Sequence, residues 1–354
     1  MGLDYPDIFL IGEQKCGTTS LNKLLIDHPR ICRKGVKEKH FFSDSGNDTE
    51  WLSKTDAFNS EFSKCKKNEL TIDATPSYVS LDYVPDRIKR SYTADNLRAK
   101  KFILVLREPA ARHYSEYQRL VPGCLVLLDD AARMAYASSE MVETAENKCR
   151  AILKKHSKGD QKFNLSQIQV SNVMTFNEWS NSFFGLKQLA RGEYHAQITN
   201  WLQYISRSQL MILNFEELVT DTTATMLRLS RFLNIDGTAF YNKHRTIVLP
   251  APAARNHYVA YDLAKLDCET LTALERYFLI VNQGLLHVIN NHTSRPDSEP
   301  IFAPFRSSAH KCTWTNITFE LKGLLGSERR DHKHFSTNHT HVGRDWNLTE
   351  TGWL

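Results

Sequence analysis

The chain has no hydrophobic run that could cross a membrane, because no stretch approaches roughly 18 consecutive apolar residues. Its N-terminus also lacks the charged-then-apolar pattern of a secretory signal peptide. We therefore expect a soluble chain. The first apolar segment begins almost directly after Met1, which leaves open a missing upstream segment, such as a membrane anchor.

Zinc-ribbon and thioredoxin-type motifs are not expected, because none of the seven cysteines forms a C-x-x-C pair. A large charge of one sign is lacking too: the net charge of +5 suits an anionic ligand without requiring nucleic acid. Six N-x-[ST] sequons, more than chance predicts, favour a secretory lumen. In that setting Cys124 and Cys149 are candidates to bridge an inserted loop.

With 41% apolar residues, the chain of 354 residues can form a real core, as one large α/β domain or two smaller ones. Short apolar runs predict buried strands in 7–11, in 69–78 (ending at Asp73), in 100–109 and in 210–218. Helical patterns follow the first and last runs, the latter with Asp221 or a neighbouring threonine as cap. The fold class predicted is a doubly wound α/β parallel sheet, which binds ligands at the carboxyl ends of its strands.

Two parts of the chain stand outside this pattern. Residues from about 120 to 180 are polar and irregular, which predicts an insertion within a domain spanning 5–290. Residues 291–354 are polar and rich in histidine, and we expect an extension of unknown role. The spacing of its histidines fits no standard metal site, so no metal is predicted.

The first candidate site is the stretch "DIFLIGEQKCGTTSL", residues 7–21, which runs from a strand through a Gly-rich turn into a helix. Gly12 and Gly17 are spaced as in a nucleotide-binding P-loop, but the K-[ST] pair that handles a γ-phosphate and magnesium is missing. Lys15 stands inside the loop instead. Helix N–H groups and hydroxyls can cradle a phosphate there. The loop residues predicted to bind are Lys15, Cys16, Gly17, Thr18, Thr19 and Ser20.

The second candidate site is "LREPAARHYSEY", residues 106–117. Arg107 stands at a predicted strand end, and Ser115 follows eight residues later, on the first turns of the next helix. A guanidinium and a hydroxyl placed in this way suit one phosphate group.

Together these two stretches resemble the sulfotransferases that use 3′-phosphoadenosine 5′-phosphosulfate. In that family a K-x-G-T-T-like loop binds the 5′-phosphosulfate, and an R-x7-S segment binds the 3′-phosphate. The resemblance implies that Lys15 bridges the sulfonate and its leaving phosphate, so that no γ-phosphate lysine and no metal is needed. It covers about residues 6–119 and 187–286.

The stretch "GVKEKHFF", residues 35–42, is similar to a motif of the glycan-modifying branch of this family. In the related heparan sulfate glucosaminyl 3-O-sulfotransferases the glutamate of this motif is the catalytic base. The resemblance assigns that role to Glu38, and His40, which matches the histidine two positions on, is a further candidate catalytic residue. A carboxylate between Lys37 and Lys39 is expected to stay charged and to accept a proton from a sugar hydroxyl.

The stretch "IDATPSY", residues 72–78, also resembles this branch, and Asp73 is expected to orient the base or the acceptor. Ala74 stands where the heparan enzymes have lysine, so the chain looks closer to the N-acetylgalactosamine 4-sulfate 6-O-sulfotransferase group. Family members often close a basic loop over the donor, for which Arg255 is the candidate.

The function implied is sulfonate transfer from 3′-phosphoadenosine 5′-phosphosulfate to a glycan hydroxyl, with an anionic polysaccharide such as chondroitin sulfate as partner. Sequons and resemblance imply a Golgi location, with membrane contact only through a missing anchor. Two alternatives stay open. One is a P-loop small-molecule kinase with a degenerate loop and "LTID" as its metal-binding strand, and the other is a non-catalytic glycan-binding protein.

Overall fold

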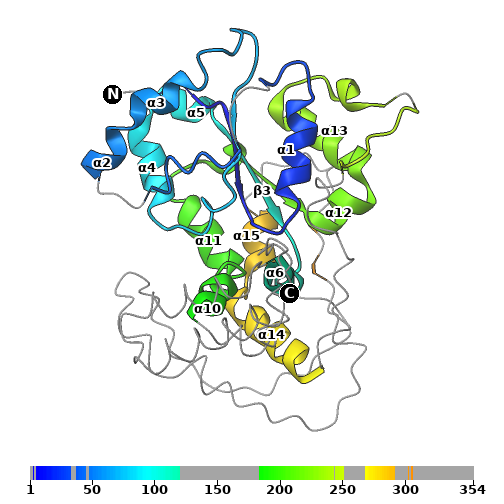
Figure 1. Ribbon diagram of the computed structural model, residues 1–354. Helices are drawn as coiled ribbons and strands as arrows, with labels where there is room; N and C mark the ends of the chain where they lie inside the picture. Colours follow the sequence, from blue (N-terminus) through cyan, green and yellow to red (C-terminus); the bar gives the residue numbers. More distant parts are fainter. Residues whose placement is uncertain are drawn as a thin grey trace, which may run out of the picture. The chain divides into compact units, whose positions relative to one another are not determined.

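The structure is a computed structural model that describes residues 3, 5–32, 37–44, 48–119, 183–242, 244–250, 268–291, 302 and 304–305 (Figure 1). The chain divides into two compact units. The first comprises Met1–Arg112, Ala190–Tyr261 and Val281–Ala303, and the second comprises His113–Leu189, Asp262–Ile280 and Pro304–Leu354. The proposed domain limits of 5–290 remain a prediction.

The first unit contains a parallel sheet of four strands in the order β2-β1-β3-β4. The strands are β1 (Ile8–Gly12), β2 (Ile72–Asp73), β3 (Lys101–Leu106) and β4 (Leu210–Asn214). All four lie within the predicted apolar runs or overlap them, and the parallel α/β fold class is confirmed. Strands buried on both faces need such continuous apolar sequences.

Helices account for most of the remaining described residues. In the first unit they are α1 (Thr18–Ile26), α2 (Asp48–Leu52), α3 (Thr55–Ser60), α4 (Val84–Ser91), α5 (Ala94–Ala99), α11 (Tyr194–Trp201), α12 (Phe215–Thr220), α13 (Thr222–Leu233) and α15 (Leu285–Asn291), with short 3-10 turns η3 (Arg207–Gln209) and η4 (Gly237–Phe240). The second unit holds most of α6 (Pro109–Arg119), α10 (Phe183–Ala190) and α14 (Cys268–Val281).

Both faces of the sheet are covered (Figure 1). On one face, Leu10 of β1 and Val105 of β3 belong to a buried cluster with α1 and α13. On the other face, Phe9 stacks on Phe102 with ring centres 5.0 Å apart, and Phe102 meets Trp201 of α11 at 5.6 Å. Because successive side chains of a strand point to opposite faces of the sheet, apolar residues pack against helices on both faces.

The last predicted strand is shorter than expected, because it ends at a helix cap. The run 210–218 was expected to be a strand throughout, yet β4 ends at Asn214 and α12 follows at once. The Asn214 side chain accepts hydrogen bonds from the main-chain N–H groups of Glu216 and Glu217, which starts the helix. The predicted cap of α13 is confirmed, since Asp221 accepts from the N–H of Ala224.

Several sequence predictions lie outside the described residues, namely the insertion of residues 120–180, the histidine-rich extension beyond a few residues, the Cys124–Cys149 pair and Arg255. Among the helices that are described, none is long and apolar enough to span a membrane.

Candidate active site

The loop between β1 and α1 contains the predicted anion-binding residues. Its main chain is left-handed at Lys15, with φ of 71°, and at Gly17, with φ of 80°. Gly17 is the N-cap of α1, so no side-chain oxygen caps the first N–H groups, and the first turn contains no acidic residue. These N–H groups and the positive end of the helix dipole are suited to an anionic group.

The two glycines let this loop pack closely against its neighbours. A Cβ atom on Gly12 would lie 2.4 Å from Cγ1 of Val79, and one on Gly17 would lie 2.8 Å from Cε2 of Phe215. Gly17 also adopts the left-handed conformation that other residues tolerate poorly. The spacing of the glycines therefore reflects close packing as well as the turn.

The hydroxyl residues that open α1 differ in accessibility. Thr19 is exposed, whereas Thr18 and Ser20 are buried. Lys15 is half-buried in the loop before them. Thr19 and Lys15 are thus accessible to solvent, whereas the hydroxyl groups of Thr18 and Ser20 are in the interior.

Cys16 faces the core instead. Its side chain is fully buried among the apolar residues of β1, α1 and α13, and Sγ lies 3.8 Å from the carbonyl oxygen of Gln14. Burial, with a smaller effect of the Glu13 charge, raises the pKa of the Cys16 thiol to about 12. The predicted role of Cys16 in donor binding therefore does not involve its thiol, which stays protonated inside the protein.

Arg107 follows β3 and lies against the same loop. Its Nη1 atom donates to the carbonyl oxygen of Lys15 at 3.4 Å, and its guanidinium lies 4.9 Å from the centre of the Phe215 ring. The Tyr194 hydroxyl donates to the carbonyl oxygen of Arg107 at 2.9 Å. The structure thus brings Arg107 to the loop of Lys15, as the parallel strand order requires.

The other two residues predicted to bind the donor are placed differently. Ser115 lies in α6, in the second unit, and is buried. Its Oγ makes no hydrogen bond within the part of the chain that the structure describes. Arg255 lies outside the described residues.

A buried ion pair beside the loop was not found from the sequence. Glu13 is fully buried, and its Oε1 lies 3.2 Å from Nη1 of Arg191. Burial raises the pKa of Glu13, and the charges of Arg191 and Arg112 oppose this shift. The sequence shows an arginine in "LARGEY", just before α11, but nothing in that stretch indicates that Glu13 is the partner of Arg191.

The candidate base Glu38 lies in a segment with unusual main-chain conformations. Glu38 has a φ of 64° and His40 a φ of 56°. Each left-handed residue that is not glycine costs about 1–2 kcal/mol, and such residues are concentrated at functional sites. The Glu38 side chain is 41% exposed, pairs with Lys37, and lies 3.9 Å from Nε2 of His40. A carboxylate with this exposure is accessible to an acceptor hydroxyl.

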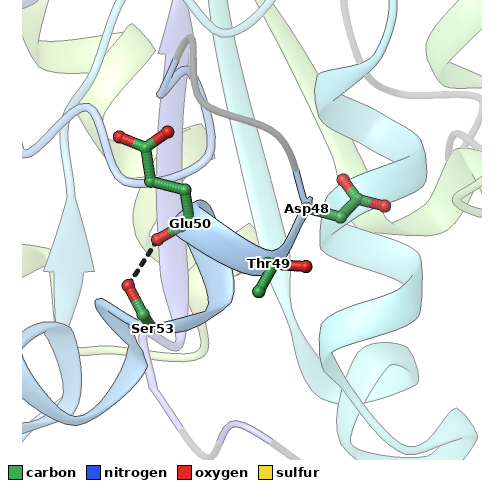
Figure 2. A pocket seen from close by; sticks show the side chains of 4 residues that line it. All are labelled: Asp48, Thr49, Glu50 and Ser53. Atoms are coloured by element: carbon green, nitrogen blue, oxygen red, sulfur yellow. Dashed lines mark hydrogen bonds between the residues drawn. The ribbon is translucent and has the colours of Figure 1, made fainter.

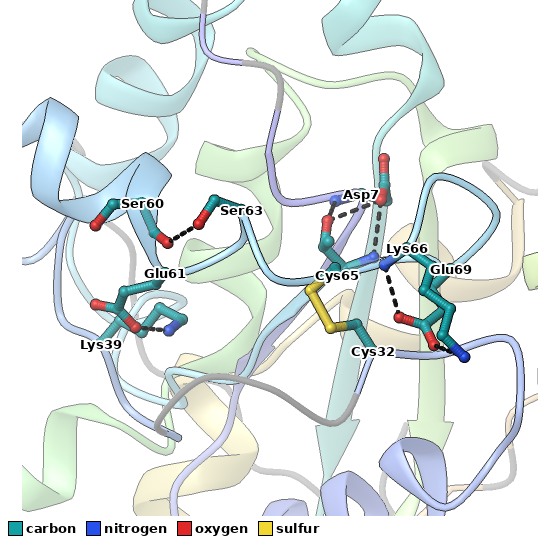
Figure 3. The surroundings of a disulfide bond; sticks show 10 residues. Asp7, Cys32, Lys39, Ser60, Glu61, Ser63, Cys65, Lys66 and Glu69 are labelled. Atoms are coloured by element: carbon teal, nitrogen blue, oxygen red, sulfur yellow. Dashed lines mark hydrogen bonds and ion pairs between the residues drawn. A yellow bond between two sulfur atoms is a disulfide. The ribbon is translucent and has the colours of Figure 1, made fainter.

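The sequence predicts that the Glu38 carboxylate lies between the amino groups of Lys37 and Lys39. This prediction is wrong for Lys39. Lys39 pairs with Glu61, as Figure 3 shows, and its Nζ lies 4.9 Å from the centre of the Phe62 ring. The left-handed residues on either side direct it away from Glu38, and its side chain is only 2% exposed.

A disulfide between Cys32 and Cys65 links the chain shortly before this segment to the chain after α3 (Figure 3). The N–H of Cys32 also donates to the carbonyl oxygen of Leu70 at 2.8 Å. The Glu69 carboxylate lies within 4.8 Å of both sulfur atoms, but these are bonded to each other and provide no thiolate for a metal.

Asp73 is the last residue of β2 and is fully buried. Its Oδ1 accepts from Oγ1 of Thr75 at 2.6 Å, and its Oδ2 accepts from the Tyr78 hydroxyl at 2.8 Å. Burial raises the pKa of Asp73, and the two hydroxyl donors oppose that shift. Burial and the Asp73 charge raise the pKa of Tyr78 well above its usual value, so Tyr78 keeps its proton and remains a donor.

A surface pocket lies elsewhere in the first unit, lined by Asp48, Thr49, Glu50 and Ser53 (Figure 2). Ser53 donates to the carbonyl oxygen of Glu50, and Asp48 pairs with Arg90 at 2.8 Å. Its two carboxylates make it unsuited to an anionic ligand, and its lining includes none of the predicted site residues.

Comparisons with known proteins agree with this geometry. Residues 5–248 match the family model described as "Sulfotransferase domain". The chain is 22% identical over 233 residues to heparan sulfate glucosamine 3-O-sulfotransferase 5 of Homo sapiens, covering 65% of this chain and 54% of that protein. It is also 22% identical over 333 residues to the membrane-associated sulfotransferase kil1 of Dictyostelium discoideum, covering 80% of this chain and 65% of that protein.

Among solved structures, a sulfotransferase from Alicyclobacillus acidocaldarius is similar, with 21% identity, a TM-score of 0.45, and coverage of 80% of this chain and 96% of the other. The chain spans about half the length of the human relative. Because the family model matches well over half of its residues, the chain belongs to the sulfotransferase domain family.

Proposed function

We propose that the protein transfers a sulfonate group from 3′-phosphoadenosine 5′-phosphosulfate to a hydroxyl group of a glycan. The observation that supports this most directly is the contact between the Arg107 guanidinium and the carbonyl oxygen of Lys15. It joins the two motifs that the family uses for the two phosphate ends of the donor. The family match and the names of the relatives agree with this proposal.

In this proposal the acceptor oxygen attacks sulfur, and the bond from sulfur to the leaving phosphate oxygen breaks. Lys15 and the first-turn N–H groups of α1 stabilise the charge that develops on that phosphate. Removing one such donor typically lowers the rate by about 10²–10³. Arg107 binds the 3′-phosphate. Ser115, from the motif alone, is a further candidate for that phosphate, and Arg255 is a candidate for closing over the donor.

Glu38 takes the proton of the acceptor hydroxyl as general base, a contribution typically of about 10²–10⁴ in rate. Its exposed carboxylate and the nearby imidazole of His40 support this role. Asp73 has no exposed surface and both oxygens occupied, which favours an orienting role over contact with the acceptor.

The acceptor that we propose is an anionic glycosaminoglycan. Several relatives are named for heparan sulfate, which supports this class. Ala74 in place of the lysine of the heparan enzymes favours a galactosamine-containing chain such as chondroitin sulfate. A disulfide within the first unit and the sequons suit the lumen of the Golgi, where we place the protein.

The decisive experiment is calorimetric titration of adenosine 3′,5′-bisphosphate into the full chain with EDTA present. We expect binding in the micromolar range that weakens by about 10- to 100-fold in Arg107→Ala, the usual cost of losing charge-assisted hydrogen bonds. Arg107→Lys is the matched control, since it keeps the positive charge but loses the planar guanidinium, whose paired N–H groups can bind two oxygens of one phosphate. Binding of ATP with magnesium in place of the bisphosphate would instead indicate a kinase.

Turnover is measured next, as transfer of labelled sulfonate to heparan, chondroitin and dermatan chains. We expect Glu38→Gln to lose transfer while keeping affinity for the bisphosphate. Donor binding without transfer to any acceptor would favour a non-catalytic glycan-binding protein.

A further inference from the structure

We infer that Asp73 is a positioning residue that holds the main chain around Glu38 through the hydroxyls of Thr75 and Tyr78. The inference rests on the proposed function, in which Glu38 accepts a proton from the acceptor. It gives the orienting role expected of Asp73 a physical path, which runs through two side-chain hydroxyls to the main chain of the Glu38 segment.

The segment that carries Glu38 needs external support. Glu38 and His40 are both left-handed, two residues apart, although neither is glycine. A chain with such conformations is not held by local hydrogen bonds of a helix or strand. Phe41 and Phe42 anchor its C-terminal end by burial, and the N–H groups of the segment provide the main-chain contacts that position Glu38 itself.

Three alternate N–H groups of this segment donate to one neighbouring stretch of chain. The N–H of Glu38 donates to the carbonyl oxygen of Ala74 at 3.0 Å. The N–H of His40 donates to Oγ1 of Thr75 at 3.4 Å, and that of Phe42 donates to the Tyr78 hydroxyl at 3.3 Å. Two of the three acceptors are thus side-chain hydroxyls, which can rotate.

Asp73 removes that freedom. Each of its carboxylate oxygens accepts the proton of one of these hydroxyls, at 2.6 and 2.8 Å. With their protons directed at Asp73, Thr75 and Tyr78 present lone pairs to His40 and Phe42. A carboxyl group suits this arrangement because each of its oxygens can accept, whereas an amide of the same shape has a nitrogen donor in place of one oxygen.

The same stretch is attached to the donor loop on its other side. The N–H of Val79 donates to the carbonyl oxygen of Ile11 in β1 at 2.9 Å, and the Trp201 indole donates to the carbonyl oxygen of Val79 at 3.2 Å. Val79 also fills the space beside Gly12. Residues 73–79 therefore set the position of Glu38 relative to the loop of Lys15.

Four variants test this arrangement. Tyr78→Phe and Thr75→Val each remove one hydroxyl, and Asp73→Asn replaces one acceptor by a donor. Thr75→Ser keeps the hydroxyl and is the matched control. We expect kcat for sulfonate transfer to fall by about 10- to 100-fold in the first three, as for a catalytic group misplaced by about 1 Å. The control keeps most of the activity, and the affinity for adenosine 3′,5′-bisphosphate is unchanged in all four.

Amide hydrogen exchange supplies a readout that does not depend on turnover. The N–H groups of His40 and Phe42 should exchange faster in Asp73→Asn and Tyr78→Phe than in the unmodified protein. The N–H of Val79 is the internal control, because its partner Ile11 is outside the network. Unchanged exchange at His40 and Phe42 overturns the inference even if the protein proves inactive.

The outcomes separate this inference from the proposed function. If Glu38→Gln is inactive while the three network variants retain full kcat, the inference fails and the proposed function stands. A loss confined to Asp73→Asn also overturns it, because Asp73 would then act without the hydroxyls. Full activity of Glu38→Gln would instead contradict the role of Glu38 as the base, and the inference with it. The absence of both transfer and bisphosphate binding in the unmodified protein is what counts against the proposed function.

Discussion

The guanidinium of Arg107 lies 4.9 Å from the centre of the Phe215 ring, and this ring also closes the space beside Gly17. Phe215 is the first residue of α12, directly after β4. The third and fourth strands of the chain therefore contribute to a loop formed after the first. A change at Phe215 or Gly17 should affect both motifs of the proposed donor site.

Gly17→Ala should destabilise the protein and weaken binding of adenosine 3′,5′-bisphosphate. The new Cβ would lie 2.8 Å from Phe215, and alanine at a φ of 80° costs about 1–2 kcal/mol in addition. Gly284→Ala is a matched control, because Gly284 has a φ of 82° but its Cβ would lie 3.6 Å from the nearest atom, on His195. Urea unfolding should show the larger loss for Gly17→Ala, and titration a loss of affinity for that variant alone.

Arg191→Met should lower the free energy of unfolding by about 3 kcal/mol near neutral pH, because it removes the ion-pair partner of the buried Glu13 carboxylate and leaves only the charge of Arg112 to oppose the cost of burial. The double variant Glu13→Gln/Arg191→Met should lose less. Equal losses in the two variants would show that the charge of Glu13 is not the cause.

The loss of unfolding free energy in Arg191→Met should also depend on pH. Burial already raises the pKa of Glu13 in the folded state, and removing Arg191 raises it further. An acid with a raised folded pKa loses stability as the pH rises from its unfolded pKa through its folded pKa. The difference between Arg191→Met and the unmodified protein should therefore shrink on acidification from about pH 7 to about pH 5, measured by urea unfolding at each pH.

The Cys16 thiol should resist alkylation in the folded protein. It is fully buried, and its pKa of about 12 leaves almost no thiolate near pH 8. Mass spectrometry of the peptide containing Cys16, after iodoacetamide treatment, should show labelling only when the protein is unfolded. Rapid labelling in the native state, with bisphosphate binding intact, would contradict the placement of this side chain.

Cys32→Ala/Cys65→Ala should lower the free energy of unfolding by about 3–4 kcal/mol, the chain-entropy value for a loop of this size. The two cysteines are 33 residues apart in sequence. We expect kcat to fall more than donor affinity, since the link lies ahead of the Glu38 segment and not in the donor loop. Thermal unfolding and titration of the double variant measure the two effects.

The sheet could be predicted from the sequence because buried parallel strands require continuous apolar runs, and "KFILVL" and "DIFLI" permit little else. The turn between β1 and α1 could be predicted as well, since two glycines stand between an apolar run and a helical pattern. Its donor-binding role remains a prediction. Its contact with Arg107 could be predicted because β1 and β3 are parallel, so the residues that follow the two strands lie at the same edge of the sheet. These features depend on local sequence and on the geometry of a parallel sheet.

The contacts around Glu38 could not be predicted in the same way. Lys39 is adjacent to Glu38 in sequence, but left-handed residues on both sides turn it to Glu61. The pairing of residues 38–42 with residues 74–78 is tertiary, and no local pattern encodes it. The Cys32–Cys65 bond was missed for a related reason, since seven cysteines without a C-x-x-C motif allow many pairings.

The hydrogen bonds that hold the Glu38 segment come from its main chain, and they do not depend on the side chains that the segment presents. Lys37 can therefore be exchanged for a residue of another charge without loss of these anchors. The charge beside Glu38 and the main-chain conformation of the segment can therefore change independently of each other.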